Sequence, residues 1–457
     1  MSRRIGGRGI MLVLLMVAPA PGLVAQASTA RGISLSEAVE LAVSSSSRLR
    51  GAEAAIEAGV ARRSEARTGR LPALALEASY MRLEAEEPAE IPLPDPPRRP
   101  GSITLGDSIE NSYDATLSLR QPIFTGGEIT AGIEGADYAV AASRGGYEWE
   151  RSGVELEART AYWKLIEAGL RVEAIEERLR QVELNLENME SRLAAGVVTK
   201  SALLTVEMKL AEARLRLLRA RNGRELNVTR LALMTGLSAD TDLRPTTTLE
   251  SAGKSEEQPP PGESEVGRLI RDALANRGDL AALRAELNAT RASKSRARGG
   301  WFPKLFLAGE YSYARPNRTS FPVKDAFESS WRVGIVGRIE LGDMPRVYHE
   351  SSRREAEVRA AAARLQAAED HVQLAVREAY LAYRSSYREV ELARIMVTQA
   401  EESMDDTRGR VENGVALNED LLEAQATLLE ARLALTSART GRRIAHDRLI
   451  REIGINP

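Results

Sequence analysis

The chain has 457 residues, of which 43% are hydrophobic, 28% charged and only 4% aromatic. This composition is typical of long helices rather than of a compact α/β enzyme. A net charge of −2 at pH 7 gives no strongly basic surface, so no nucleic-acid partner is expected. Because cysteine is absent, a disulfide scaffold, a thiolate metal site and a lipid anchor on cysteine are all excluded.

The N-terminus has the pattern of a secretory signal peptide. Three arginines precede the apolar stretch 10–18, and Ala25 and Ala27 supply the small residues of a cleavage site. We therefore expect residues 1–27 to be a signal peptide and the chain to be exported. No later segment reaches the ~18 consecutive apolar residues of a membrane-spanning helix. An exported chain of this kind is expected to be either soluble or a β-barrel protein.

The sequence contains one structural unit twice. RLAAGVVTKSALLTVEMKL surrounds Gly196, and RVENGVALNEDLLEAQATL surrounds Gly414, 218 positions later. The apolar positions of the two segments superimpose, which indicates an internal duplication. We expect a first repeat over 28–239, a linker over 240–262 and a second repeat over 263–457.

Each repeat is predicted to hold a long helix and a returning helix. The first long helix spans about 128–195 without proline, roughly 100 Å at 1.5 Å per residue, and its copy spans about 346–413. The returning helices are expected over about 199–235 and 418–452. Apolar residues in the first long helix step alternately by four and three, which favours side-by-side helix packing: Ile175, Leu179, Val182, Leu186, Met189 and Leu193.

The turns between these helices also have a recognisable chemistry. Gly196 and Gly414 stand where a helix ends in a left-handed residue. Thr199 is the expected N-cap of the first returning helix, and Asn418 that of the second. Each repeat should therefore form a long helical hairpin with a tight tip.

Four segments alternate between apolar and polar residues as strands do: 71–84, 111–124, 301–313 and 329–341. One face would carry residues such as Leu117, Tyr311 and Trp331, and the other Arg120 and Glu310. This pattern suits a transmembrane β-barrel, although a soluble antiparallel sheet with one wet face shows it as well. Four strands are too few to close, since the smallest barrels of one chain have about 8, so three copies would have to pool twelve.

Short motifs complete the pattern in the expected order. Leu71-Pro72 and Phe302-Pro303 open the first strand of each repeat, and the stretch 122–127 (PIFTGG) closes a strand pair. With the two glycine tips, these motifs make the mature chain resemble a TolC-family outer membrane factor. The resemblance implies a mainly α fold with a transmembrane β part, in which a homotrimer forms a 12-stranded outer-membrane β-barrel and a periplasmic tunnel of helical hairpins. The linker 240–262 would lie at the equator of that tunnel.

The resemblance also implies a function. Such proteins are passive exit ducts of tripartite efflux systems, served by a periplasmic adaptor protein and an inner-membrane pump of the RND, ABC or MFS type. The alternative is the outer membrane outlet of a type I protein secretion system. The strands would contact outer membrane lipid, and no cofactor is expected.

Two kinds of site residue follow. Asp420 and Glu423 occupy the positions, six and nine residues past the second tip glycine, where family members place a periplasmic gate, although both also suit a solvated helix N-terminus. Val411 and Ala416 replace the tyrosine and arginine with which the family prototype latches its tips, so a different latch is expected, through Arg408, Arg410 or Glu412. Adaptor docking is expected at the exposed hairpin tips: Gly196, Val197, Thr199, Gly414, Val415 and Asn418.

Other classes of protein fit the sequence poorly. The three histidines lie on separate expected helices or faces, and no metal-binding or phosphate-binding motif occurs, so no catalytic or metal site is expected. A coiled-coil scaffold would lack the alternating strands, and a diffusion porin would lack the ~100 Å helices. The loop 84–101 holds six prolines and is expected to be an exposed, semi-rigid segment.

Overall fold

The computed structural model describes residues 31–84, 89–92, 102–105, 109–249, 259–317, 319 and 323–455. The expected signal peptide 1–27 lies outside these residues. Most of the proline-rich loop 84–101 and residues 250–258 of the expected linker also lie outside them.

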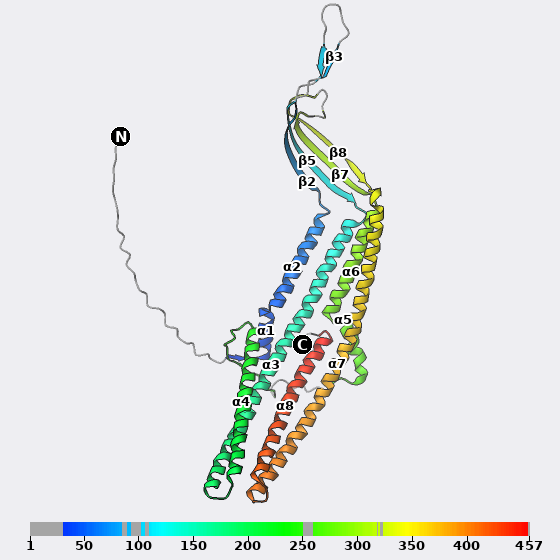
Figure 1. Ribbon diagram of the computed structural model, residues 1–457. Helices are drawn as coiled ribbons and strands as arrows, with labels where there is room; N and C mark the ends of the chain where they lie inside the picture. Colours follow the sequence, from blue (N-terminus) through cyan, green and yellow to red (C-terminus); the bar gives the residue numbers. More distant parts are fainter. Residues whose placement is uncertain are drawn as a thin grey trace, which may run out of the picture.

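The molecule is a long bundle of helices with a sheet at one end and two hairpin tips at the other (Figure 1). The first repeat consists of α1 (Leu35–Ser45), α2 (Ser47–Thr68), β2 (Ala73–Arg82), β5 (Asn111–Phe124), α3 (Glu128–Ala194) and α4 (Lys200–Met234). The second consists of α5 (Val266–Asn276), α6 (Gly278–Arg298), β7 (Lys304–Arg315), β8 (Glu328–Arg338), α7 (Met344–Glu412) and α8 (Asn418–Glu452). The prediction of long helical hairpins with four strands in the alternating segments is confirmed.

The four long strands form one antiparallel sheet in the order β2-β5-β7-β8. Strand register turns the alternation of the sequence into two faces. A row on the apolar face consists of Leu76, Leu117, Tyr311 and Trp331. A neighbouring row on the polar face consists of Ala75, Ser118, Glu310 and Arg332. In the single chain Leu76 is 75% and Trp331 76% exposed, so the apolar face has no cover within one copy.

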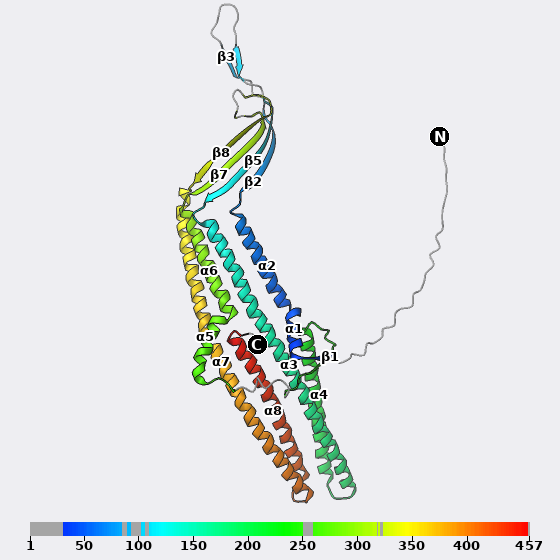
Figure 2. The ribbon, with the colours of Figure 1, turned by 180° about the vertical axis from the view of Figure 1, so that it is seen from behind.

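Helix α3 is the central element of the bundle, since it packs against α2 and α4 of its own repeat and against α6 and α8 of the other. Figure 2 shows from behind that the second hairpin, α7 with α8, runs alongside the first. Within the part of the chain that the structure describes, no helix is both long and apolar enough to cross a membrane.

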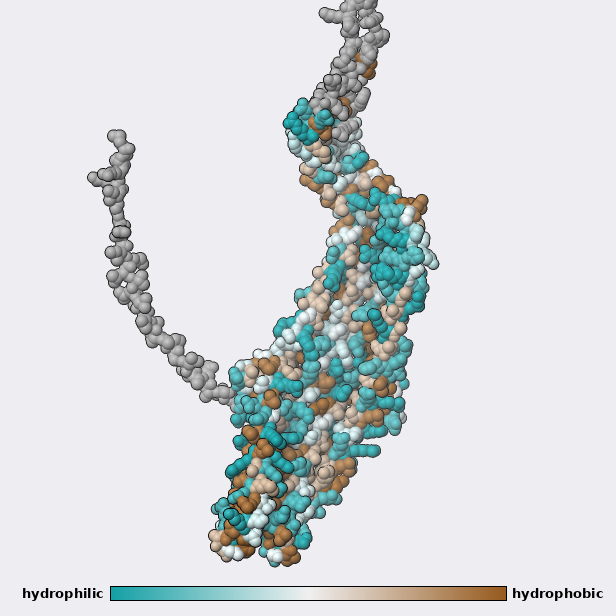
Figure 3. Space-filling model, viewed as in Figure 1, coloured by the Kyte–Doolittle hydropathy of each residue, from teal (hydrophilic) through white to brown (hydrophobic). Residues whose placement is uncertain are grey.

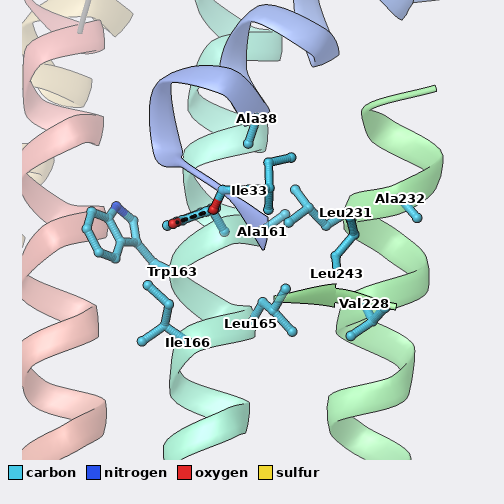
Figure 4. Packing of buried hydrophobic residues seen from close by; sticks show 11 residues of the cluster. Ile33, Ala38, Ala161, Trp163, Leu165, Ile166, Val228, Leu231, Ala232 and Leu243 are labelled. Atoms are coloured by element: carbon cyan, nitrogen blue, oxygen red, sulfur yellow. Dashed lines mark hydrogen bonds between the residues drawn. The ribbon is translucent and has the colours of Figure 1, made fainter. Parts of the chain in front are cut away.

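The main core lies halfway along the bundle, where two short strands meet α3 and α4 (Figure 4). Strand β1 (Arg31–Ile33) pairs in parallel with β6 (Leu243–Pro245), which belongs to the expected linker. Tyr162 of α3 is fully buried, and its hydroxyl donates to the Ile33 carbonyl at 3.1 Å. The segment after α4 is thus paired with the strand that precedes α1, before the second repeat begins.

A second contact region joins α3 to the second repeat through glycine. A Cβ atom added to Gly145 would lie 2.7 Å from the Gly278 carbonyl oxygen, and one added to Gly278 would lie 2.7 Å from the Gly145 oxygen. Close beside this crossing, the Trp149 ring has Arg277 at 4.1 Å and Arg451 at 4.0 Å. The absence of side chains at the two glycines lets α3 and α6 approach closely enough for these cation–π contacts.

Gly145→Ala should therefore destabilise the protein by about 1–3 kcal/mol, because the added methyl group meets rigid backbone of α6. The matched control is Gly146→Ala, where a Cβ atom meets nothing within 4 Å. The control should stabilise the helix by about 0.5–1 kcal/mol. Thermal unfolding followed by circular dichroism in detergent gives both values. Equal melting temperatures for the two variants would contradict the close crossing.

Candidate functional site

The two hairpin tips are built in the same way. Gly196 and Gly414 have φ angles of 75° and 74°, in the left-handed region that the sequence predicts. The Val197 N–H donates to the Arg192 carbonyl at 2.9 Å, and the Val415 N–H to the Arg410 carbonyl at 2.8 Å. These bonds satisfy carbonyl groups that would otherwise be left without partners at the helix ends.

The N-caps of the two returning helices differ. Thr199 caps α4 as expected, and its hydroxyl accepts the Ala202 N–H at 3.3 Å. The expectation that Asn418 caps α8 is wrong, since Leu417 is the N-cap residue and Asn418 the first helical residue. The physical reason is that the Asp420 carboxylate reaches back to accept the Leu417 N–H at 2.9 Å, which satisfies that donor without a polar cap side chain.

Both tips expose apolar side chains at the end of the molecule opposite the sheet (Figure 3). Val197 is 71%, Val415 70% and Leu417 70% exposed. Large apolar side chains at such exposure are candidates for contact with a partner.

The two acidic gate candidates lie on the first turns of α8, exposed to solvent in the single chain. The Asp420 carboxylate accepts the Leu417 N–H at the start of this helix. Glu423 lines a groove of about 260 Å³ between the two hairpins, together with Lys209 and Glu212 of α4. The structure thus gives Asp420 a capping role and places Glu423 beside charges of the other hairpin.

Arg178 of α3 links the two hairpins. Its side chain is buried and donates to the Gln425 side-chain oxygen and, at 3.0 Å, to the Leu422 carbonyl of α8. These acceptors are uncharged, and burial, followed by the nearby Arg216 charge, lowers the pKa of the Arg178 guanidinium. Closer to the tip, the Asn418 side-chain amide donates to the side-chain oxygen of Asn185 at 3.0 Å.

These linking residues differ from those expected as the latch. Arg408 and Arg410 pair within α7, with Asp405 at 3.4 Å and Asp406 at 4.0 Å. The sequence analysis missed Arg178 as a link between the hairpins because it considered only residues at the tip itself. The available signal was its position at the edge of the apolar seam, three residues after Ile175 and directly before Leu179.

Among the described residues, no three histidine, aspartate or glutamate side chains are grouped so that they would hold a metal ion. The polar groups of the hairpins are instead paired with one another, as in the Arg216–Glu430 ion pair at 2.9 Å between α4 and α8.

Comparison with solved structures agrees with this fold. A membrane protein from Pseudomonas aeruginosa is 22% identical, with a TM-score of 0.77 and coverage of 92% of this chain and 90% of its own. The Campylobacter jejuni CmeC outer membrane channel is 16% identical, with a TM-score of 0.77 and coverage of 92% and 85%. The open state of the Neisseria gonorrhoeae MtrE outer membrane channel is 17% identical, with a TM-score of 0.74 and coverage of 92% and 89%. No curated protein matches the chain.

The model of the outer membrane efflux protein family matches residues 38–237 and 269–454. These two segments correspond to the two hairpin-bearing repeats, and together they cover most of the chain. The family consists of channels rather than enzymes, with their strands in the outer membrane and their helices in the periplasm. The chain therefore belongs to the outer membrane efflux protein family, of TolC type.

Proposed function

We propose that three copies of this chain form the exit duct of a tripartite efflux system. The observation that carries this proposal is the sheet with its two open edges. Among the residues that the structure describes, β2 and β8 have a strand partner on one side only, and the apolar face beside them is exposed. Unpaired edges are not tolerated in lipid, so β2 of one copy would pair with β8 of the next until the sheet closes.

The helices support the same assembly. Exposed apolar side chains follow α4 at near-helical spacing: Leu204, Met208, Leu215, Leu218, Leu226 and Leu233. A second exposed set follows α7: Leu374, Leu381, Leu392, Ile395 and Met396. Such stripes are the surface that a neighbouring helix covers in a coiled coil. Packing α4 of one copy against α7 of the next would surround a continuous tunnel with helices.

In this assembly the sheet would release substrate outside the cell, and the tips would receive it from the periplasmic adaptor and the inner-membrane pump. The tips are suited to that contact because they are the exposed apolar turns at the far end of the long hairpins. Asp420 and Glu423, repeated around the threefold axis, would bring carboxylates together near the narrow end of the tunnel.

A ring of carboxylates should make the channel favour cations, because like charges are weakly screened where a pore is tighter than the ~8–10 Å Debye length. Asp420→Asn with Glu423→Gln should move the reversal potential in a salt gradient toward zero while the trimer persists. Asparagine keeps the acceptor that caps Leu417. The matched control is Glu207→Gln, an exposed acid of α4 that does not line the groove beside Glu423.

Planar-bilayer recordings of the purified protein measure this potential. A wild-type protein that forms no channel would contradict the proposed function itself. A channel whose reversal potential is the same in the double variant would show that these acids do not line the pore.

Arg178→Met should loosen the contact between the hairpins and raise the basal conductance. Methionine fills similar volume but cannot donate to Gln425 or Leu422. The free energy of unfolding should change by no more than about 1 kcal/mol, since the lost hydrogen bonds are offset by relief of a buried, uncompensated charge. Arg180→Met, at an exposed position paired with Glu177, is the control. An unaltered conductance in Arg178→Met would rule out a latch at this position.

Adaptor docking at the tips is tested by cysteine crosslinking. Because the chain has no native cysteine, only the introduced thiol can react. Val197→Cys and Val415→Cys should each trap the periplasmic adaptor encoded with this protein when a short bifunctional thiol reagent is added. Asp240→Cys, exposed near the middle of the bundle, is the comparison site. Trapping from Asp240→Cys alone would place the main contact away from the tips.

A further inference from the structure

The polar face of the sheet is hollowed near its periplasmic half. A depression of about 520 Å³ lies over β5, β7 and β8. Its floor is formed by residues that pair across neighbouring strands. Arg120 of β5 pairs with Ala308 of β7, and Ala308 pairs with Gly334 of β8. Two neighbouring positions thus carry a methyl group or no side chain at all, while larger side chains surround them. The depression follows from the choice of residues at these paired positions.

Three arginines surround this floor: Arg120, Arg332 and Arg338. Glu310 is the single acidic residue among those that line the depression, and it binds Arg332 at 2.5 Å. The lining therefore keeps an excess of positive charge. This local excess attracts anions, because the other acidic residues of the face do not line the depression: Glu77, Asp114 and Glu328.

Arg120 is held in place by an aromatic side chain. Its guanidinium carbon lies 3.9 Å from the centre of the Phe306 ring, which also lines the depression. Stacking fixes the guanidinium plane and leaves its N–H groups free to bind a planar acid group. Phe306 and Val336, which pair across β7 and β8, add an apolar wall beside the arginines. A charged group and an apolar body would thus be bound side by side.

We propose that this depression is a weak binding station for organic anions, such as carboxylates or sulfonates carried on an apolar or aromatic body. The proposal rests on the proposed function, since the closed sheet would turn its polar face toward the lumen. An anionic lipid headgroup has the same charge, but lipid would contact the opposite face, where Leu117, Tyr311 and Trp331 lie. The occupant is therefore a solute in transit.

The probe for this station is a trisulfonated pyrene dye, which is water-soluble, anionic and aromatic. Its binding to the purified protein in a non-ionic detergent is measured by fluorescence anisotropy. Its block of single channels is measured from the side of the sheet. The variant combines Arg120→Gln, Arg332→Gln and Arg338→Gln, and Arg120→Gln alone serves where the triple variant assembles poorly. Arg82→Gln is the matched control, since Arg82 lies in the same sheet on the opposite face.

The triple variant should bind the dye at least about tenfold more weakly and lose block to the same extent, with Arg120→Gln giving a smaller loss. The control should match the wild type. Equal affinity in the triple variant and the wild type, or an equal loss in Arg82→Gln, would overturn the proposal. Failure of the proposed function would be distinct, since dye binding would persist in detergent while the protein formed no channel in the bilayer.

Discussion

The structure depends on one constraint, that every backbone hydrogen-bonding group in the sheet must find a partner. In the described part of one chain, β5 and β7 are paired on both sides, whereas β2 and β8 each have one edge without a strand partner. In water the N–H and C=O groups at such an edge can hydrogen-bond to the solvent, but the lipid interior offers them no partner. The apolar face of the sheet is stable in contact with lipid. In lipid, the open edges find hydrogen-bond partners only if a neighbouring copy pairs with them. The exposed apolar stripes on α4 and α7 would likewise be covered by a neighbouring copy.

Helix α3 holds the other helices together along the length of the molecule. Between the sheet and mid-length it crosses the start of α6 at Gly145 and Gly278. At mid-length Tyr162 joins it to β1, and toward the tip Arg178 joins it to α8. Each contact links segments far apart in sequence, and two of the three link the repeats. The two hairpins are therefore held by a common axis, and relative motion of the tips would have to break the few polar contacts between α3 and α8.

The two hairpins are similar in sequence and geometry, but small differences give them different local contacts. The tip glycines have nearly the same φ angle, yet Thr199 caps one returning helix while Asp420 performs this function in the other. With the cap supplied by Asp420, the side chain of Asn418 is free to bind Asn185 of the other hairpin. A local substitution in one repeat thus allowed a contact that a symmetric pair of hairpins would lack.

The sequence by itself determined the helices, the strands with their two faces, and the left-handed glycines at the tips. These features depend on neighbouring residues, through apolar periodicity and allowed backbone angles, and so can be recognised locally. The pairing of β6 with β1 and the partners of Arg178 were decided only by tertiary structure. The cap of α8 is again a local contact, from Asp420 to Leu417 three positions away. Arg178 meets Gln425 across 247 positions, and the depression beside Arg120 exists only because strand register sets it against Ala308 and Gly334. Periodicity shows which face a residue occupies, but only the packed chain shows which residue it meets there.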